Sequence, residues 1–156
     1  WSSEPDFVHT WPVHCQVGSA GHNVQPDVLA ACNEWELKKS RGFERVLKGQ
    51  NPNVESYSAI RAEVVDPLDP RTDTNRPLLE RLGRADRILV AGEALSHCVA
   101  ATVNDVIQLA TAPADVMARK IVLFRDGSSP VAGFEAQGER FLKQLTQGGG
   151  SVASLA

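Results

Sequence analysis

Two short apolar runs constrain the fold more than any other feature of this sequence. They are residues 87–91, Arg-Ile-Leu-Val-Ala, and residues 120–124, Lys-Ile-Val-Leu-Phe. Neither run alternates apolar with polar side chains, as a strand with one solvated face would. A continuous apolar run is typical of a strand that is covered on both faces. We therefore predict two strands of a parallel sheet that are covered on both faces.

Helical patterns lie before, between and after these runs. Apolar residues recur at helical spacing in four segments: 26–35, 74–83, 99–110 and 134–145. Weaker apolar runs at 43–47 and 151–155 are further strand candidates. Strands that alternate with helices are joined by right-handed crossovers and form a parallel sheet. The predicted fold class is α/β, a parallel sheet flanked by helices on both faces in three layers.

The length of the chain bounds its domain organisation. A chain of 156 residues is long enough for one domain with its own core, so we expect a single domain over residues 1–156. Sheets of this kind usually open with an apolar strand that leads into a helix, and residues 1–20 contain no such run. We therefore expect the first strand–helix unit to be absent and the domain to be N-terminally incomplete.

Composition excludes several classes of partner. Sixteen Lys and Arg against 19 Asp and Glu give a net charge of -3, which leaves no basic surplus to bind nucleic acid. No apolar run approaches the roughly 20 residues of a membrane span, and no signal peptide opens the chain. Three cysteines are an odd set and make no disulfide framework. We expect a cytoplasmic protein without membrane or nucleic-acid partners.

Cys98 is the strongest candidate for chemistry. It follows a predicted strand, the bend at Gly92 and the start of the next predicted helix. The free N–H groups and the dipole at a helix start favour the thiolate, which is the nucleophilic form, and they can hold a developing oxyanion. A buried cysteine that packs the helix onto the sheet is the equally weighted alternative. Cys15 and Cys32 lack this placement.

Other polar and aromatic residues could share a cleft with Cys98. Ligands of open parallel sheets bind beyond the carboxyl ends of the strands, where Lys48 follows the run 43–47. A lysine there could hold a thiolate, although an exposed lysine is the commoner reading. Trp11 and Tyr57 could line the binding site of a flat ligand, or they could belong to the core. His14 could be a metal ligand, a base or a loop residue. The spacing of the histidines matches no known pattern of metal ligands, so the sequence does not decide between these roles.

Three segments, taken in order, resemble the nicotinamidase/isochorismatase-like cysteine hydrolase family. They are Trp11-Pro12-Val13-His14-Cys15 with Gly18, Lys48-Gly49 followed by Ser56-Tyr57-Ser58, and Val90 to Thr102 around Cys98. The match spans roughly residues 11–105. The first segment is similar to the one that marks the nicotinamidase branch of the family.

The resemblance implies a reaction and its machinery. Cys98 would attack an amide carbonyl and form a thioester, with Lys48 as the lysine of the catalytic triad. The backbone amides of Ala94 and Cys98 would form the oxyanion hole after a cis peptide bond between Glu93 and Ala94. The substrate would be nicotinamide or a similar small amide, hydrolysed to acid and ammonia.

The resemblance also implies ligand contacts and a metal. Trp11 and Tyr57 would hold the substrate ring. His14 would be one ligand of a divalent ion of zinc, iron or manganese. The protein would be a homo-oligomer that binds a small-molecule amide substrate.

The sequence departs from the family pattern in ways that keep alternatives open. The triad aspartate and the other metal ligands of the family precede the Trp11 segment, where Asp6 and His9 have the right type but the wrong position. Ser96 stands where many relatives carry Asp. One alternative is therefore a non-catalytic relative that serves as a binding or oligomerisation scaffold. Others are an isochorismatase-like hydrolase of a different small substrate and, less strongly, a thiol redox protein.

Overall fold

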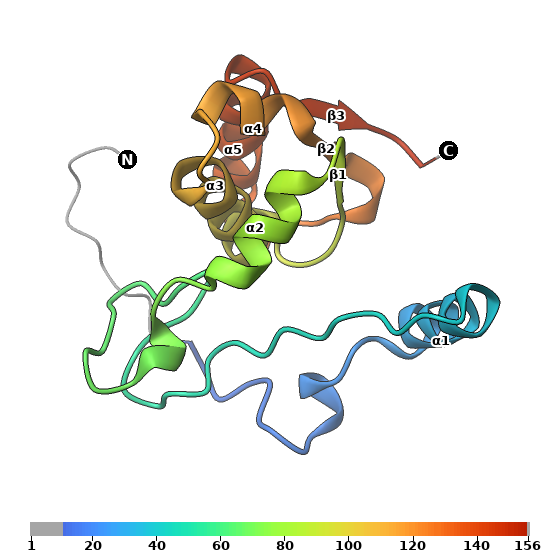
Figure 1. Cartoon of the computed structure of the whole chain (residues 1–156). Helices are drawn as coiled ribbons and strands as arrows, with labels where there is room; N and C mark the ends of the chain where they lie inside the picture. The colour runs from blue at the N-terminus through green and yellow to red at the C-terminus, as the bar shows by residue number, and fades with distance from the viewer. Residues whose placement is uncertain (1–10, 156) are drawn as a thin grey trace. The chain divides into compact units, whose positions relative to one another are not determined.

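The computed structural model describes residues 11–155 (Figure 1). The chain divides into two compact units, Trp1–Arg45 and Val46–Ala156. The single domain expected from the sequence over residues 1–156 stays a prediction. No helix within residues 11–155 is both long and apolar enough to cross a membrane.

The first unit contains a short 3-10 helix, Ala20–His22, and helix α1, Pro26–Lys39. The Gln25 side-chain oxygen caps α1 by accepting hydrogen bonds from the backbone N–H groups of Asp27 and Val28, at 2.8 and 2.9 Å. Pro26 occupies the first helical position, where its missing N–H costs nothing. The helix predicted over 26–35 is thus confirmed and runs one turn further.

The second unit contains a three-stranded sheet. Its strands are β1, Ile88–Val90, β2, Ile121–Phe124, and β3, Ser151–Ala153. All pairs are parallel in the order β1-β2-β3, with Ile88 opposite Ile121 and Val122 opposite Ser151. The two apolar runs and the weaker run at 151–155 are confirmed as strands. The run 43–47 is not a strand, because within the described residues no strand pairs with it.

Four helices belong to this unit: α2, Arg76–Arg84, α3, Ala100–Leu109, α4, Ala114–Lys120, and α5, Glu135–Gln147. The Asn75 side-chain oxygen caps α2 by accepting the Leu78 N–H at 3.2 Å. Gly83 lies within the last turn of α2. Helix α4 was not predicted, since its seven residues show too short an apolar repeat to be recognised. The unit also contains two 3-10 turns, Pro70–Thr72 and Arg125–Gly127, and a π-helical turn, Leu95–Val99.

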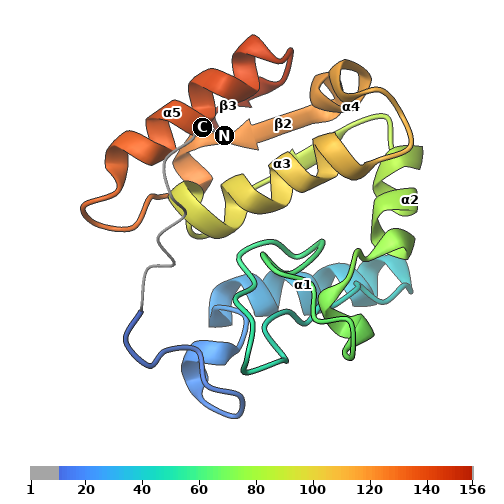
Figure 2. The same ribbon diagram turned by 90° about the vertical axis from the view of Figure 1, so that its left-hand side faces the viewer.

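The core joins the sheet to α3 and α5. Ile121 and Leu123 of β2 are fully buried, and the core cluster also contains Val103 and Val106 of α3 and Phe141 of α5. In the view of Figure 2, β2 lies between α3 and α5. In β1, Ile88 and Val90 are half-buried, whereas Leu89 between them is 62% exposed. The predicted α/β class with a parallel sheet and packed helices is confirmed.

The carboxyl ends of the strands meet at one edge of the sheet, because all three strands run the same way. The turns that follow them are tied together. The Gly92 N–H donates to the Gly127 carbonyl at 2.9 Å, and the Asp126 carboxylate accepts from the Leu155 N–H. This cross-linked edge is the frame on which the candidate site is built.

Candidate active site

Cys98 lies in a tight connection between β1 and α3. The chain leaves β1 through Gly92 at a φ of 130°, a conformation that disfavours any side chain. The peptide bond between Glu93 and Ala94 is cis, as the resemblance implies. A π-helical turn, Leu95–Val99, then leads into α3. Cys98 is therefore in the turn that enters the helix, with its side chain partly exposed.

Neighbouring segments fix this turn. Leu95 is fully buried, and its N–H donates to the Ser129 carbonyl at 2.7 Å. The Glu93 carboxylate accepts the Ser129 N–H at 3.1 Å, and the Ser96 hydroxyl accepts the Val131 N–H at 3.0 Å. The turn that carries Cys98 is thus held at three points by residues 129–131.

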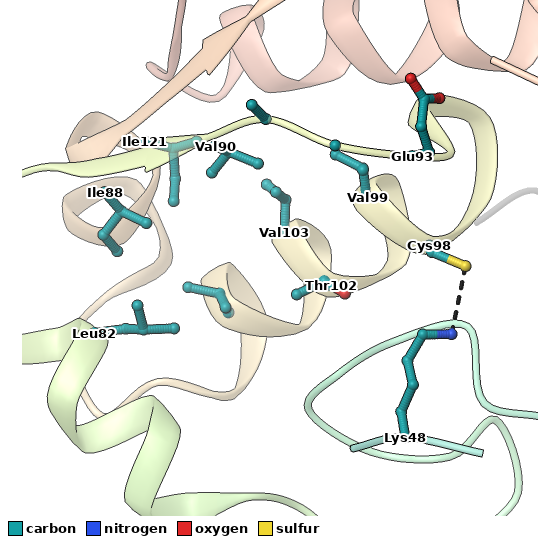
Figure 3. Close-up of a pocket in the computed structure, with 13 residues that line it drawn as sticks. Lys48, Leu82, Ile88, Val90, Glu93, Cys98, Val99, Thr102, Val103 and Ile121 are labelled. Atoms are coloured by element: carbon teal, nitrogen blue, oxygen red, sulfur yellow. Dashed lines mark hydrogen bonds between the residues drawn. The ribbon is translucent and has the colours of Figure 1, made fainter. Parts of the chain in front are cut away.

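Lys48 reaches Cys98 from a segment 50 residues earlier in the chain. Its ammonium Nζ lies 3.5 Å from the Cys98 Sγ and donates to the Ser56 carbonyl at 2.7 Å (Figure 3). Lys48 follows an extended segment without strand pairing, and Gly49 then turns the chain at a φ of 66°. The sequence argument placed Lys48 at the end of a strand, which is wrong, but the structure brings the lysine and the thiol together.

Tyr57 belongs to a row of rings beside this pair. Its ring centroid lies 5.5 Å from that of His97, which makes an edge contact with Phe134 at 4.8 Å. The His97 Nδ1 lies 2.9 Å from the Ser96 hydroxyl. The residue before Cys98 is therefore part of an aromatic wall. His97 and Phe134 were not predicted as site residues, because nothing in their spacing links them to Tyr57.

The loop 55–63 carries Ser56 and Tyr57 and is anchored on α3. The Ala59 N–H donates to the Thr102 hydroxyl at 3.0 Å, and Ile60 is 1% exposed. Thr102 follows Cys98 by one helical turn, so the two side chains lie on one side of the helix. The contact between Thr102 and Ala59 was not predicted either, because a threonine within a helical pattern does not indicate a distant backbone partner.

Glu63 closes the loop 55–63 and has an altered pKa. Its backbone N–H donates to the Glu55 carbonyl at 3.0 Å. The residue as a whole is exposed, but its carboxyl group is partly buried. That burial is the main cause that raises the pKa of Glu63, and the negative charge of Asp105 raises it further.

A cavity of about 320 Å³ opens beside the Lys48–Cys98 pair (Figure 3). Lys48, Glu93, Cys98 and Thr102 bring polar groups to it, and the rest of its wall is apolar: Leu82, Ile88, Val90, Ala91, Gly92, Val99, Val103, Val106 and Ile121. In Figure 3 the Glu93 carboxylate points away from Cys98. A small apolar cavity with a few polar groups has the general character of a small-molecule site.

The Ala94 amide is available for an oxyanion. The Ala94 carbonyl accepts hydrogen bonds from His97 and Val99, both at 3.0 Å, which fixes the peptide unit that follows the cis bond. Within residues 11–155, nothing accepts a hydrogen bond from the Ala94 N–H. The roles of Ala94 and Cys98 as oxyanion donors stay a prediction that this geometry permits.

Trp11 and His14 lie in the first unit. Trp11 is half-buried, and the His14 Nδ1–H donates to the Pro12 carbonyl at 2.7 Å. In neutral His14 this contact leaves the lone pair on Nε2. Asp6 and His9 fall outside the described residues. The substrate contact of Trp11 and the metal ligation of His14 stay predictions.

The described residues do not form a metal site. In the part of the chain from 11 to 155, no three His, Cys, Asp or Glu side chains come together in a way that could hold an ion. A divalent ion needs several such ligands at once, so His14 alone does not fit the metal that the resemblance implies.

Comparison with solved structures shows the fold. The structure of the yeast nicotinamidase Pnc1p matches with a TM-score of 0.63 and 21% identity, over 92% of this chain and 57% of that chain. The same yeast enzyme bound to the inhibitor nicotinaldehyde matches with a TM-score of 0.64 and 20% identity, over 92% and 58%. No protein-family model matches the sequence, and no curated protein does. The chain spans a little over half the length of the solved structures that it matches.

Proposed function

We propose that this chain carries the nucleophile and the activating lysine of an amide hydrolase similar to nicotinamidase. The observation that supports it best is the 3.5 Å contact between the Lys48 ammonium and the Cys98 sulfur, at the carboxyl edge of a parallel sheet. The likeness to yeast nicotinamidase supports the fold on which such a site is built. The proposed substrate is nicotinamide or a similar small amide.

In the proposed reaction, the Cys98 thiolate adds to the amide carbonyl carbon and forms a carbon–sulfur bond. The carbonyl oxygen becomes an oxyanion, for which the Ala94 N–H is a donor. The carbon–nitrogen bond then breaks, and ammonia leaves with a proton that the neighbouring Lys48 ammonium can supply. Water hydrolyses the resulting thioester to the acid and returns the thiol. The sum of the steps is amide plus water to acid plus ammonia.

The aromatic row and the cavity support a flat substrate. Tyr57 presents a ring beside the nucleophile turn, and the cavity wall next to Cys98 is largely apolar. An apolar site with a thiol at one end favours a planar amide over a charged or extended one. The resemblance further leads us to propose that the active form is a homo-oligomer.

The proposal is tested with nicotinamide and with nicotinaldehyde, whose carbonyl can accept the thiol but has no leaving group. The natural full-length protein should release ammonia from nicotinamide, and Cys98→Ala should abolish that release. With a ¹³C-labelled aldehyde carbonyl, the wild-type protein should convert the carbonyl signal to that of a thiohemiacetal carbon, whereas Cys98→Ala should not. Equal ammonia release by the two proteins would refute the proposal.

The non-catalytic scaffold remains the second candidate function, and thiol reactivity separates it from the enzyme. A hydrolytic Cys98 should be alkylated quickly near neutral pH, because Lys48 supports its thiolate. A cysteine that only packs the helix should react slowly. Slow alkylation of Cys98 together with no turnover of any small amide would favour the scaffold.

A further inference from the structure

The helix that follows the sulfur also holds the loop that receives the lysine. Thr102 lies one helical turn after Cys98, and its hydroxyl accepts the Ala59 N–H at 3.0 Å (Figure 3). Ala59 belongs to the same loop as Ser56, whose carbonyl accepts a hydrogen bond from the Lys48 ammonium at 2.7 Å. The Thr102 hydroxyl is therefore linked, through this loop, to the ammonium beside the sulfur.

The position of the Lys48 ammonium depends on the Ser56 carbonyl. Lys48 is exposed and follows a segment without secondary structure, so its long side chain has many conformations available. Of its hydrogen bonds to Ser56 and Cys98, the bond to Ser56 is the shorter, at 2.7 Å against 3.5 Å. A shift of the Ser56 carbonyl would draw the ammonium away from the sulfur.

The loop is compact around Ala59, so that a shift there reaches Ser56. The two neighbours of Ala59, Ser58 and Ile60, are 3% and 1% exposed. The Ser58 hydroxyl accepts the Ile60 N–H at 3.0 Å, which closes a tight turn over Ala59. Closely packed residues transmit a displacement to their neighbours rather than absorb it.

The other polar contacts of the loop leave Thr102 as its stronger polar link to α3. The Ile60 carbonyl accepts the Asn75 N–H at 2.7 Å, which joins the loop to the segment before α2. Arg61 lies 3.6 Å from Asp105 of α3, but the Arg61 side chain is 45% exposed, and an exposed ion pair contributes little. Of these two polar contacts with α3, the Thr102 hydrogen bond is the shorter and the better shielded from water.

We infer that Thr102 is a positioning residue of the Cys98–Lys48 site. Its hydroxyl fixes the loop at Ala59, and the loop presents the Ser56 carbonyl that directs the ammonium at the sulfur. The inference rests on the proposed function only in taking Cys98 as a reactive thiol. Because the Thr102 hydroxyl bonds to the loop, its effect on the thiol should pass through Lys48.

Two substitutions separate the hydroxyl of Thr102 from the shape of its side chain. Thr102→Ser keeps the oxygen that accepts the Ala59 N–H, whereas Thr102→Val has nearly the same shape and no acceptor. Ala59 is half-buried, so without that acceptor its N–H gains a partner only if the loop moves toward water. Thr102 also lines the cavity beside Cys98, and the Lys48→Met background isolates any direct effect of the hydroxyl on the thiol.

The experiment measures the rate at which iodoacetamide alkylates Cys98 in the natural full-length protein, near neutral pH and at low ionic strength. Trypsin releases Cys98 in the peptide 88–119. Cys15 and Cys32 lie in a different peptide, which ends at Lys38, and serve as internal controls. Mass spectrometry follows the alkylated fraction of each peptide with time.

We expect Thr102→Val to react at least about twofold more slowly than Thr102→Ser, as residues coupled through one network do. Thr102→Ser should react at close to the wild-type rate, because it retains the hydroxyl. In the Lys48→Met background, the two Thr102 variants should react at the same rate, since no ammonium is left for the loop to position.

Two outcomes would overturn the inference. One is an equal alkylation rate for Thr102→Val and Thr102→Ser in the protein that retains Lys48. The other is a rate difference that persists in the Lys48→Met background, which would show that the hydroxyl acts on the thiol by another route. If Thr102→Val does not fold, as judged by circular dichroism, Thr102→Ala replaces it with the same expectation, because its smaller side chain leaves room for water at the Ala59 N–H.

The alkylation cycle is independent of amide turnover. If the cycle shows the expected coupling and no amide is hydrolysed, the positioning role stands and the proposed activity fails. If amide is hydrolysed and the cycle shows no coupling, the positioning role alone fails.

Discussion

Replacing Lys48 by methionine should slow the alkylation of Cys98 by a factor that follows from the structure. The Lys48 ammonium and the Cys98 sulfur are 3.5 Å apart, Lys48 is exposed, and Cys98 is partly exposed. For two unit charges at that distance in a medium close to water, the Coulomb energy is about 1.2 kcal/mol. The sulfur that reacts with iodoacetamide is an anion, so the loss of this attraction in Lys48→Met should lower the alkylation rate about sevenfold.

The measurement uses iodoacetamide at low ionic strength, with the modified peptide 88–119 quantified by mass spectrometry. Lys143→Met is the matched control, since Lys143 is an exposed lysine of α5, and it should leave the rate unchanged. At about 1 M salt, where the Debye length is about 3 Å, the wild-type rate should approach that of Lys48→Met. A Lys48→Met rate within about twofold of wild type at low salt would refute the electrostatic reasoning.

Two further predictions concern stability. Leu95 is fully buried and Leu68 is 91% exposed, so Leu95→Ala should lower the free energy of unfolding by about 3 kcal/mol and Leu68→Ala by less than about 0.5 kcal/mol. Urea denaturation measures both, and equal losses would contradict the assigned core. Because the folded state raises the pKa of Glu63, it binds that proton more tightly than the unfolded chain, and stability should fall as pH rises from 4.5 through the raised value. Urea denaturation at a series of pH values measures this dependence, which should be absent in Glu63→Gln. If the free energy of unfolding of the two proteins changed with pH in parallel, the prediction for Glu63 would be wrong.

The elements that were predictable from the sequence are those set by local pattern. The runs at 87–91 and 120–124 are the strands β1 and β2. Ile121 and Leu123 of β2 are buried, as a continuous apolar run predicts, whereas β1 is the outer strand of the described sheet and leaves Leu89 62% exposed. Asn75 caps α2 as its residue type indicates. The run at 43–47 shows the limit of this reasoning, since strand formation depends on a pairing partner that local pattern does not reveal.

Two parts of the candidate site were predictable from the sequence: the turn that carries Cys98, and the lysine, whose place beside Cys98 the rule for open parallel sheets and the family resemblance both indicated. The turn at Gly92 and the entry of Cys98 into a helix are local features, and the structure shows both. The contacts of Lys48 with Ser56 and of Thr102 with Ala59 each join a side chain to a backbone atom of another residue. Backbone partners carry no signature in residue type, so only the folded chain reveals them.

The spacing of Cys98 and Thr102 on one helix limits how this chain can change in length. An extra residue between them would rotate one against the other by about 100° and withdraw either the sulfur or the hydroxyl from the common face. Because the hydroxyl holds Ala59 and the sulfur faces Lys48, such an insertion would uncouple two segments that the helix now keeps aligned. Insertions are better tolerated at an exposed loop position such as Val64, which is 71% exposed.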